Sequence, residues 1–283
     1  IVSERHQVVV TTPTVRLVQQ LLATFETSGL NVGAYYTDRK DTAHDVVVCC
    51  NASAASFKPR GPVIWIADEA HRTEAAGLKL AAASLAPVAA LGVTATPFRA
   101  LTEETLSLWD VVLYSYGPDD ALRDGVIVPW RRVAWEGKRV HVDVAIREMI
   151  ASSDGPGIIN ASTMDDAEVY AASLRDSGFP VATVHSGINA EDQDARIKAL
   201  LSGEYRALVH VNMLSEGVDI PELRWIALRR AVNSRVRFVQ EVGRGLRAAP
   251  GKRYATIYDP QDLCSKFKMS YAASLGWTEP DPD

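Results

Sequence analysis

The acidic pair Asp68-Glu69 directly follows an apolar run at residues 63–67, and His71 comes two residues later. Such a run predicts a buried parallel strand, and open α/β sheets place their ligands at the carboxyl ends of these strands. In phosphoryl transfer, one acid holds Mg²⁺ and another residue orients or deprotonates the attacking water. Asp68 suits the first role and Glu69 the second. An isolated Asp-Glu pair is more often a solvated acidic turn, so other stretches must decide.

A second group of candidate residues, Gln240, Arg244 and Arg247, lies near the other end of the chain. On a helix predicted near residues 236–246 these residues fall at i, i+4 and i+7, so they project from one face. Two guanidinium groups and an amide on one stripe suit a clamp for a γ-phosphate. The alternative is an exposed basic helix. Gly243 and Gly245 argue against it, because they weaken a helix and permit close approach to a partner surface.

Composition limits the kind of protein. The 283 residues suffice for two domains of ordinary size, and 47% hydrophobic with 23% charged residues is typical of a soluble globular protein. No apolar run approaches the ~18 residues of a membrane span. Three cysteines, two of them adjacent at Cys49 and Cys50, suit reduced core thiols better than a disulfide framework or a zinc site. We therefore expect an intracellular location: cytoplasm or nucleoid, or the nucleus in a eukaryote.

The charge of the chain is unevenly distributed. The net charge is −5, which argues against nucleic-acid binding by bulk electrostatics. Between residues 222 and 253, however, nine Lys or Arg stand against two Glu. Such a basic block is either a solvated face or a phosphate-binding surface.

Apolar runs alternate with helical patterns along most of the chain. A strand is predicted near residues 7–10, followed by a helix that Thr14 caps. Strands that alternate with helices imply a parallel sheet covered on both faces, and the second half repeats this architecture. Further strands are predicted near residues 46–50, 63–67 and 88–93, and then near 158–160, 181–184, 207–211, 224–228 and 254–258.

The pattern loosens after residue 97. Residues 100–139 contain Trp109, Trp130 and Trp135, and Pro129 interrupts an otherwise apolar run. This composition indicates a connecting region with edge-type strands. We therefore predict a first domain at residues 1–128, a linker at 129–150, a second domain at 151–270 and a disordered tail at 271–283.

Four stretches, taken together, resemble one family. They are Asp-Glu-Ala-His at 68–71, Thr-Ala-Thr-Pro-Phe-Arg at 94–99, Ser-Glu-Gly-Val-Asp-Ile-Pro at 215–221 and Gln-Glu-Val-Gly-Arg-Gly-Leu-Arg at 240–247. In this order they are similar to the motifs of superfamily 2 helicases and translocases, of the DEAH-box kind found in type III restriction systems. The resemblance implies an α/β fold of two RecA-like domains, each a parallel sheet flanked by helices, with ATP and Mg²⁺ in the cleft between them.

The resemblance also implies roles for single residues. Asp68 would hold Mg²⁺, and Glu69 would be the base or water-orienting group for ATP hydrolysis. His71 would couple the nucleotide to the cleft, while Thr94 and Thr96 would relay the nucleotide state to the bound strand. The second lobe would contribute Gly217 and Asp219 against ATP, and Gln240, Arg244 and Arg247 toward the γ-phosphate, with Arg247 as the arginine finger.

Other positions would face the nucleic acid. Thr12, Thr14 and Arg16 resemble the family stretch that holds strand phosphates at a helix N-terminus. Four further polar residues follow strand exits, where capping or turn formation is a competing role. Small polar groups contact phosphates without reading bases, so we expect binding that is independent of sequence. The four residues are Asn51, Ser162, His185 and Asn212.

One family motif has no counterpart in the 283 residues. No Gly-x-x-x-x-Gly-Lys-Ser/Thr run occurs, and Gly-Lys-Arg at 251–253 is the nearest fragment. That loop cradles the phosphates, and its Lys neutralises them. We expect that the sequence starts downstream of the loop, and that this polypeptide alone hydrolyses ATP poorly or not at all.

The predicted function is an ATP-dependent helicase or translocase. The Thr-Ala-Thr-Pro-Phe-Arg stretch resembles that of the DNA-processing branches of the family. This resemblance implies single-stranded or forked DNA as the partner, with RNA as the other candidate, and we expect no membrane partner. Two alternatives stay open: an ATP-independent nucleic-acid-binding or scaffold protein with this fold, and the motor subunit of a restriction-nuclease system. A nuclease or a replication or repair protein is a candidate partner.

Overall fold

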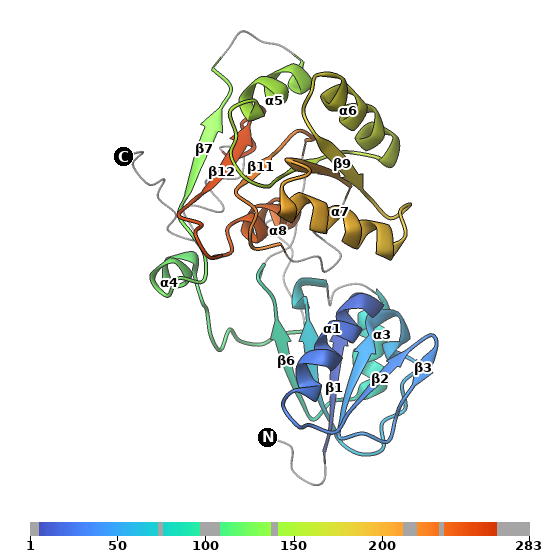
Figure 1. Ribbon diagram of the computed structural model, residues 1–283. Coiled ribbons are helices and arrows are strands. Elements are labelled where there is room, and N and C mark those ends of the chain that lie inside the picture. The colour runs from blue at the N-terminus through green and yellow to red at the C-terminus, as the bar shows by residue number, and fades with distance from the viewer. Residues whose placement is uncertain are drawn as a thin grey trace. The chain divides into compact units, whose positions relative to one another are not determined.

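The computed structural model describes residues 6–72, 76–96, 108–136, 141–211, 220–231 and 235–264. The chain divides into two compact units, Ile1–Leu113 and Tyr114–Asp283, which are described separately (Figure 1). Each unit contains one largely parallel sheet with helices packed on it, which confirms the predicted α/β fold class. Among the described residues, no helix combines the length and apolar character that crossing a membrane requires.

A mostly parallel sheet organises the first unit. In chain order its described elements are β1 (Gln7–Thr12), α1 (Val15–Glu26), β2 (Val32–Tyr36), β3 (Arg39–Lys40), β4 (Val46–Cys50), α2 (Asn51–Ala54), β5 (Val63–Asp68), a 3₁₀ turn (Ala70–Arg72), α3 (Ala76–Leu85) and β6 (Ala89–Val93). The strand order is β3-β2-β4-β1-β5-β6, and β2–β3 is the one antiparallel pair of the described sheet.

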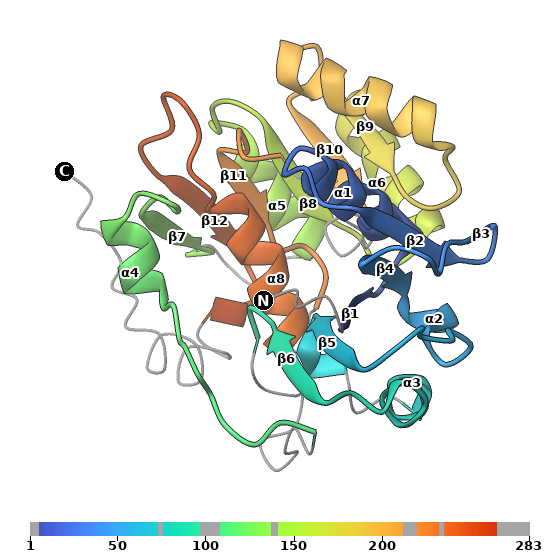
Figure 2. The ribbon, with the colours of Figure 1, turned by 90° about the horizontal axis from the view of Figure 1, so that it is seen from below.

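Both faces of this sheet are covered, because alternate side chains of a strand point to opposite sides. Val8 and Val10 pack with Val18 and Leu22 of α1 on one face. Val9 belongs to the opposite cluster, which includes side chains of α2 and α3. Figure 2 shows α1 on one side of the sheet and α2 and α3 on the other. This burial fixes the strand register that positions the residues at the strand ends.

Apolar side chains at the β6 edge of the described sheet are exposed. Val88, Leu91 and Val93 expose 62%, 43% and 51% of their surface, although strands of a parallel sheet are normally buried.

The second unit repeats the architecture. Its described elements are α4 (Pro118–Arg123), β7 (Trp130–Ala134), α5 (Val142–Ile150), β8 (Gly157–Asn160), α6 (Met164–Asp176), β9 (Val181–Val184), α7 (Ala190–Ser202), β10 (Ala207–His210), β11 (Trp225–Ala227), α8 (Arg235–Gly245) and β12 (Ala255–Asp259). The described sheet is parallel throughout, in the order β7-β12-β11-β8-β10-β9.

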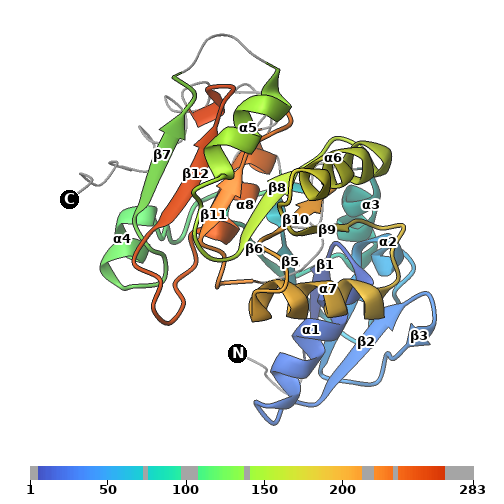
Figure 3. The same ribbon diagram turned by 45° about the horizontal axis from the view of Figure 1, so that its top comes forward.

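Trp225 fills the centre of one core of the second unit. Its cluster includes Ile146 of α5 and Leu174 of α6, and Figure 3 shows both helices on the same side of the sheet. The indole packs over Gly157, where an added Cβ would lie 1.9 Å from the ring. Trp225 Nε1 also donates a 3.0 Å hydrogen bond to the Gly155 carbonyl. Glycine at position 157 is thus required for the ring to lie against β8.

The division between the units differs from the predicted one. The second unit starts at Tyr114, before residue 128, and the segment predicted as a linker at 129–150 contains β7 and α5. β7 pairs in parallel with β12, and Ile146 and Ile150 are fully buried in the core. Only the edge-strand character of the region, expected from Pro129, agrees with the structure, since β7 lies at the edge of the described sheet.

Candidate active site

The carboxyl ends of β1, β5 and β6 bring the first group of predicted residues together. β5 pairs with β6 through Asp68 and Val93, and β1 lies on the other side of β5. Thr12, Asp68 and Thr94 therefore lie together at the carboxyl ends of their strands. Open α/β sheets bind their ligands at this end of the strands.

Two hydrogen bonds hold the Asp68 carboxylate. Thr12 Oγ1 donates to Asp68 Oδ2 at 3.1 Å, and the Glu69 main-chain N–H donates to Oδ1 at 2.9 Å. Burial raises the pKa of Asp68, the Thr12 hydrogen bond opposes this rise, and the nearby Glu69 adds to it. A half-buried carboxylate that keeps free lone pairs is a suitable hard ligand for Mg²⁺. Asp68 and Glu69 thus fit a magnesium-nucleotide site, in which Mg²⁺ takes most other ligands from water and phosphates.

Glu69 has a main-chain φ of +52°, a left-handed conformation that residues other than glycine rarely adopt. This conformation turns the chain sharply at the end of β5. Glu69 Oε2 lies 3.2 Å from His71 Nδ1. Strain of this kind persists only where the surroundings determine the conformation, and it is concentrated at functional sites.

His71 joins the acidic turn to the turn after β6. The residue is 9% exposed, and its Nδ1 lies 3.0 Å from Thr94 Oγ1 and 3.1 Å from Thr96 Oγ1. The Thr96 main-chain N–H also donates to Thr94 Oγ1 at 3.0 Å. Because one ring nitrogen faces Glu69 and both hydroxyls, a change in the position of Glu69 changes the hydrogen bonds of the 94–96 turn. The resemblance implied coupling roles for His71, Thr94 and Thr96, and these three side chains are in contact in the structure.

In the second unit, a buried polar network fixes α8 to the sheet. Asn160, at the end of β8, accepts from the Arg230 main-chain N–H at 2.8 Å and donates to Glu241 Oε2 at 3.0 Å. The Arg230 guanidinium also pairs with Glu241. His210, at the end of β10, is fully buried, and burial together with Arg230 lowers its pKa to about 3. His210 is therefore neutral at pH 7, and its two buried ring nitrogens have no hydrogen-bond partner among the described residues.

The predicted stripe of Gln240, Arg244 and Arg247 is only partly helical. α8 ends at Gly245, so Gln240 and Arg244 lie on the helix and Arg247 lies beyond it. Arg247 instead forms an antiparallel bridge with Ile127. The spacing i to i+7 therefore does not place all three side chains on one helical face, because the chain leaves the helix to pair with a distant segment.

The two glycines of α8 differ. A Cβ at Gly245 would lie 2.2 Å from Ile226 Cδ1 of β11, so glycine permits the helix end to approach the sheet. At Gly243, no atom of the described structure lies within 4 Å of the added Cβ. The close approach expected from both residues is thus found at Gly245 alone, and it is made within the second unit.

Among the predicted nucleic-acid contacts of the first unit, Thr12 is fully buried, and its hydroxyl is used on Asp68. Thr14 caps α1, as predicted, since its Oγ1 accepts from the Leu17 main-chain N–H at 3.3 Å. Arg16 lies in the first turn of α1 and is partly exposed. Asn51 is the first residue of α2, and its buried Oδ1 has no hydrogen-bond partner among the described residues.

Two predicted contacts of the second unit already have intramolecular partners. The Ser162 main-chain N–H donates to Asp166 at 2.8 Å, which leaves its exposed hydroxyl for a ligand. His185 Nε2 lies 3.1 Å from Glu168, and its Nδ1 accepts from the Gly187 main-chain N–H at 3.2 Å. Both ring nitrogens of His185 are thus engaged. Asn212, Gly217 and Asp219 lie outside the described residues.

Three arginines of the basic block at 222–253 have polar partners within the second unit. Arg229 forms a bidentate pair with Asp166, at 2.8 and 2.7 Å, and also pairs with Asp143. Arg230 pairs with Glu241 as described above, and Arg224 donates to the Gly251 carbonyl at 2.9 Å. Neither of the two roles expected for such a block describes these cations. They hold the second unit together.

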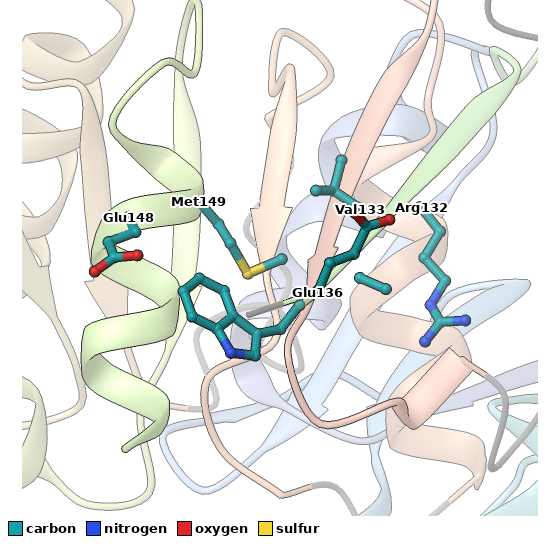
Figure 4. Close-up of a pocket in the computed structure, with 7 residues that line it drawn as sticks. Arg132, Val133, Glu136, Glu148 and Met149 are labelled. Carbon is teal, nitrogen blue, oxygen red and sulfur yellow. The ribbon is translucent and has the colours of Figure 1, made fainter. Parts of the chain in front are cut away.

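The second unit also has an open cavity of about 490 Å³ between the end of β7 and α5. Figure 4 shows Glu148 and Met149 on one side of it and Arg132 and Val133 on the other. None of the predicted site residues lines this cavity, so it is separate from the strand ends of the site. Its lining residues are Arg132, Val133, Ala134, Trp135, Glu136, Glu148 and Met149.

Residues 3–155 match the SWI2/SNF2 ATPase family, and residues 141–249 match the helicase conserved C-terminal domain. The chain belongs to the SWI2/SNF2 ATPases of helicase superfamily 2. This confirms the family that the four motifs indicated. The acidic turn at residues 68–71 and the turn at residues 94–96 both lie within residues 3–155, the segment that matches the SWI2/SNF2 ATPase family.

Relatives of this SWI2/SNF2 ATPase share parts of its sequence. UvrABC system protein B of Campylobacter hominis is 31% identical over 111 residues, which are 38% of this chain and 17% of that protein. A 51.5 kDa protein of a Lactococcus phage is 22% identical over 212 residues, which are 66% of this chain and 47% of that protein. The chain spans less than half the length of either relative.

Solved structures share the fold of this SWI2/SNF2 ATPase. S. cerevisiae Dbp5 bound to RNA and ADP BeF3 has a TM-score of 0.61 at 16% identity, over 97% of this chain and 76% of that one. The ATP-dependent Type ISP restriction-modification enzyme LlaBIII bound to DNA has a TM-score of 0.69 at 17% identity, over 91% of this chain and 24% of that one. These similarities confirm the two RecA-like lobes and, at this identity, show the fold alone.

Two residues acquire roles that the sequence did not indicate. Thr12 was expected to contact nucleic acid and instead positions Asp68. Glu241 was not expected in the site, although it adjoins Gln240 and anchors α8. A glutamate on the buried side of an amphipathic helix was the available signal, because a buried carboxylate requires a partner.

Proposed function

We propose that this chain forms the motor core of an ATP-dependent helicase or translocase that acts on DNA. The observation that carries the proposal is the single cluster at the strand ends of the first unit, in which Asp68, Glu69, His71 and the 94–96 turn contact one another. Family membership supports ATP hydrolysis. In this cluster His71 links the acidic turn with Asp68 and Glu69 to the 94–96 turn. Such a link suits an enzyme in which a change at the bound nucleotide must alter the structure elsewhere.

In the proposed reaction, Asp68 would hold Mg²⁺, and Thr12 would orient the Asp68 carboxylate. The chemistry that Mg²⁺ would supply is neutralisation of phosphate charge. Glu69 orients the attacking water and accepts its proton. His71 contacts Glu69 at 3.2 Å and also contacts Thr94 and Thr96, so a shift of Glu69 would move His71 and change its hydrogen bonds to both threonines.

Residues of the second unit are proposed to act in the same reaction. Arg244 and Arg247 would stabilise the charge that develops on the γ-phosphate, with Arg247 as the arginine finger, and Gln240 would help to position the water. Gly217 and Asp219 remain proposed ATP contacts on the basis of the motif. The Glu241 network supports this assignment, because it gives α8 a fixed place on its own sheet.

The proposed nucleic-acid contacts are phosphate contacts. Arg16 at the start of α1, the cap residue Thr14, and the hydroxyl of Ser162 have the exposure that such contacts need. Asn51, His185 and Asn212 are retained on motif position. DNA is favoured because LlaBIII was solved bound to DNA and shares the fold over 91% of this chain, whereas Dbp5, which was solved with RNA, is the argument for RNA.

The experiment is strand-stimulated ATP hydrolysis by the complete gene product, with Glu69→Gln as the test variant and Glu26→Gln, at an exposed site on α1, as the matched control. We expect Glu69→Gln to lower the stimulated kcat at least about 100-fold, since loss of a positioned base costs about 10²–10⁴-fold. ATP binding should survive. A stimulated rate that persists in Glu69→Gln contradicts the assignment of the base.

Binding measurements at matched salt separate the remaining functions, because salt dominates these affinities. Single-stranded, duplex and forked DNA are compared with the corresponding RNA. Binding of DNA without any binding of ATP would identify an ATP-independent binding or scaffold protein. Translocation without strand separation would favour the motor of a restriction-nuclease system, with cleavage done by a partner.

A further inference from the structure

Lys252 belongs to the Gly-Lys-Arg run that resembles a fragment of a phosphate loop, yet its ammonium group is used inside the second unit. The residue is 7% exposed. Its Nζ donates hydrogen bonds to the carbonyls of Gly245 at 2.8 Å, Arg247 at 2.8 Å and Pro221 at 2.9 Å. An ammonium group has three donors, so all of them are directed at main-chain oxygens.

The three carbonyls belong to the two segments of this unit that are proposed to face ATP. Gly245 ends α8, and Arg247 is the proposed arginine finger. Pro221 follows Asp219 by two residues in the sequence. The last carbonyls of a helix lack intrahelical partners, and a cation there also interacts favourably with the helix dipole. One buried charge therefore connects the end of α8 to the segment after the proposed ATP contact.

The other side of the 246–248 segment is held by main-chain hydrogen bonds. The Val128 N–H donates to the Leu246 carbonyl at 2.8 Å, and the Ala248 N–H donates to the Val126 carbonyl at 3.0 Å. These bonds form a ladder that no single side-chain substitution removes. On the side that faces Pro221, the Lys252 ammonium group supplies three hydrogen bonds to main-chain carbonyls, and a substitution of Lys252 removes all three.

We propose that Lys252 is a positioning residue for ATP hydrolysis, which fixes the main chain of Arg247 relative to the segment that follows Asp219. The inference rests on the proposed function. Lys252 does not touch the nucleotide in this account. It acts through Arg247, whose guanidinium is needed where charge develops in the transition state.

The test compares Lys252→Met with wild type in the complete gene product. We expect kcat to fall about 10–100-fold, because a misplacement of about 1 Å at a catalytic group costs up to about 10²-fold. The KM for ATP should change less than about threefold, since an interaction made in the transition state affects kcat more than ground-state binding. Lys198→Met, at an exposed site on α7, should leave both parameters unchanged.

Arg206→Met controls for a loss of stability alone. Arg206 also holds main-chain carbonyls of the second unit, those of Ala151 and Ser153, but it does so away from α8. Both variants should unfold at lower denaturant concentration than wild type. Only Lys252→Met should lose kcat at temperatures where both proteins are folded.

A pH profile gives a readout that a purely structural role would not change. Burial lowers the pKa of Lys252 to about 8, with Arg224 lowering it further and Glu222 opposing this. Above that pH the neutral amine has one donor fewer. Wild-type kcat should therefore fall as pH rises past about 8, and this step should be absent from Lys252→Met.

Three outcomes would overturn the inference: a Lys252→Met kcat within about twofold of wild type, an equal kcat loss in Arg206→Met, or an unchanged alkaline step in Lys252→Met. If Lys252→Met does not fold, the wild-type profile decides, and the absence of an alkaline step overturns the inference. Failure of the proposed function is distinct, because Glu69→Gln would then leave the ATPase rate unchanged. Loss of activity in Glu69→Gln with full activity in Lys252→Met rejects this inference alone.

Discussion

Replacing Thr12 with Val removes one of the two hydrogen bonds on the Asp68 carboxylate and leaves the volume of the side chain almost unchanged. Thr12 is fully buried, and its hydroxyl lies 3.1 Å from Asp68 Oδ2. A hydrogen bond to a charged group contributes about 1.5–3 kcal/mol. The lower end applies here, because the Glu69 N–H remains on Oδ1 and Asp68 is only half-buried. This corresponds to about tenfold weaker Mg²⁺ binding, within the range of about 10–100-fold known for outer-shell partners.

The assay is a Mg²⁺ titration of ATP hydrolysis by the complete gene product. Thr11→Val is the matched control, because the neighbouring Thr11 is equally buried but accepts a 2.8 Å hydrogen bond from Trp65 Nε1. Thr11→Val should destabilise the fold by about 1–3 kcal/mol, since a buried N–H loses its partner, and it should leave the Mg²⁺ midpoint unchanged. Equal Mg²⁺ midpoints for wild type and Thr12→Val would refute the reasoning.

Three further predictions concern the fold. Gly157→Ala should lower the free energy of unfolding in urea by about 1–3 kcal/mol through overpacking against Trp225, and an unchanged midpoint would refute the packing argument. The hydrogen bonds from Arg229 hold the pKa of Asp166 below its usual range. The stability that this ion pair contributes is therefore present above the pKa of Asp166 in the unfolded chain and is lost on acidification. Asp166→Asn should flatten the pH dependence of stability below pH ~5, and an unchanged slope would contradict this. Burial raises the pKa of Cys49 to about 12, so a thiol reagent at pH ~8 should modify it only on unfolding, and rapid modification of the folded protein would disprove its burial.

The acidic site could be predicted from the sequence because its chemistry is local. Residues 63–71 contain the strand, both carboxylates and the histidine, and the Thr-Ala-Thr turn follows another short apolar run. Parallel pairing then places these strand ends at one edge, which the alternation of strands and helices already implied. The cap at Thr14 was predictable for the same reason, since its hydrogen bond lies within the four consecutive residues 14–17.

Features that depend on long-range pairing could not be predicted in this way. Arg247 leaves the helical face because Ile127, far away in the sequence, pairs with it. β7 belongs to the second unit because β12 pairs with it, and the sequence of residues 129–150 does not indicate that pairing. Thr12 contacts Asp68 because β1 and β5 are neighbours in the sheet, a register that a strand pattern does not specify.

The basic block shows the same limit. Counting charges between residues 222 and 253 suggested either a solvated face or a phosphate surface, but Arg229 pairs with Asp143 on α5 and Asp166 on α6, which lie outside the counted segment. Neutralisation by acids from other elements depends on tertiary structure. Net charge of a segment is therefore a weak guide where the fold brings acids to it.

Glu69 and Arg247 are proposed to act in one hydrolytic step. A double-mutant cycle on strand-stimulated kcat tests this proposal most directly, with Glu69→Gln, Arg247→Ala and the double variant. Groups that act as a unit are strongly non-additive. We predict that the double variant is no slower than the slower single variant by more than about threefold. A double variant whose loss equals the product of the two single losses would contradict this proposal.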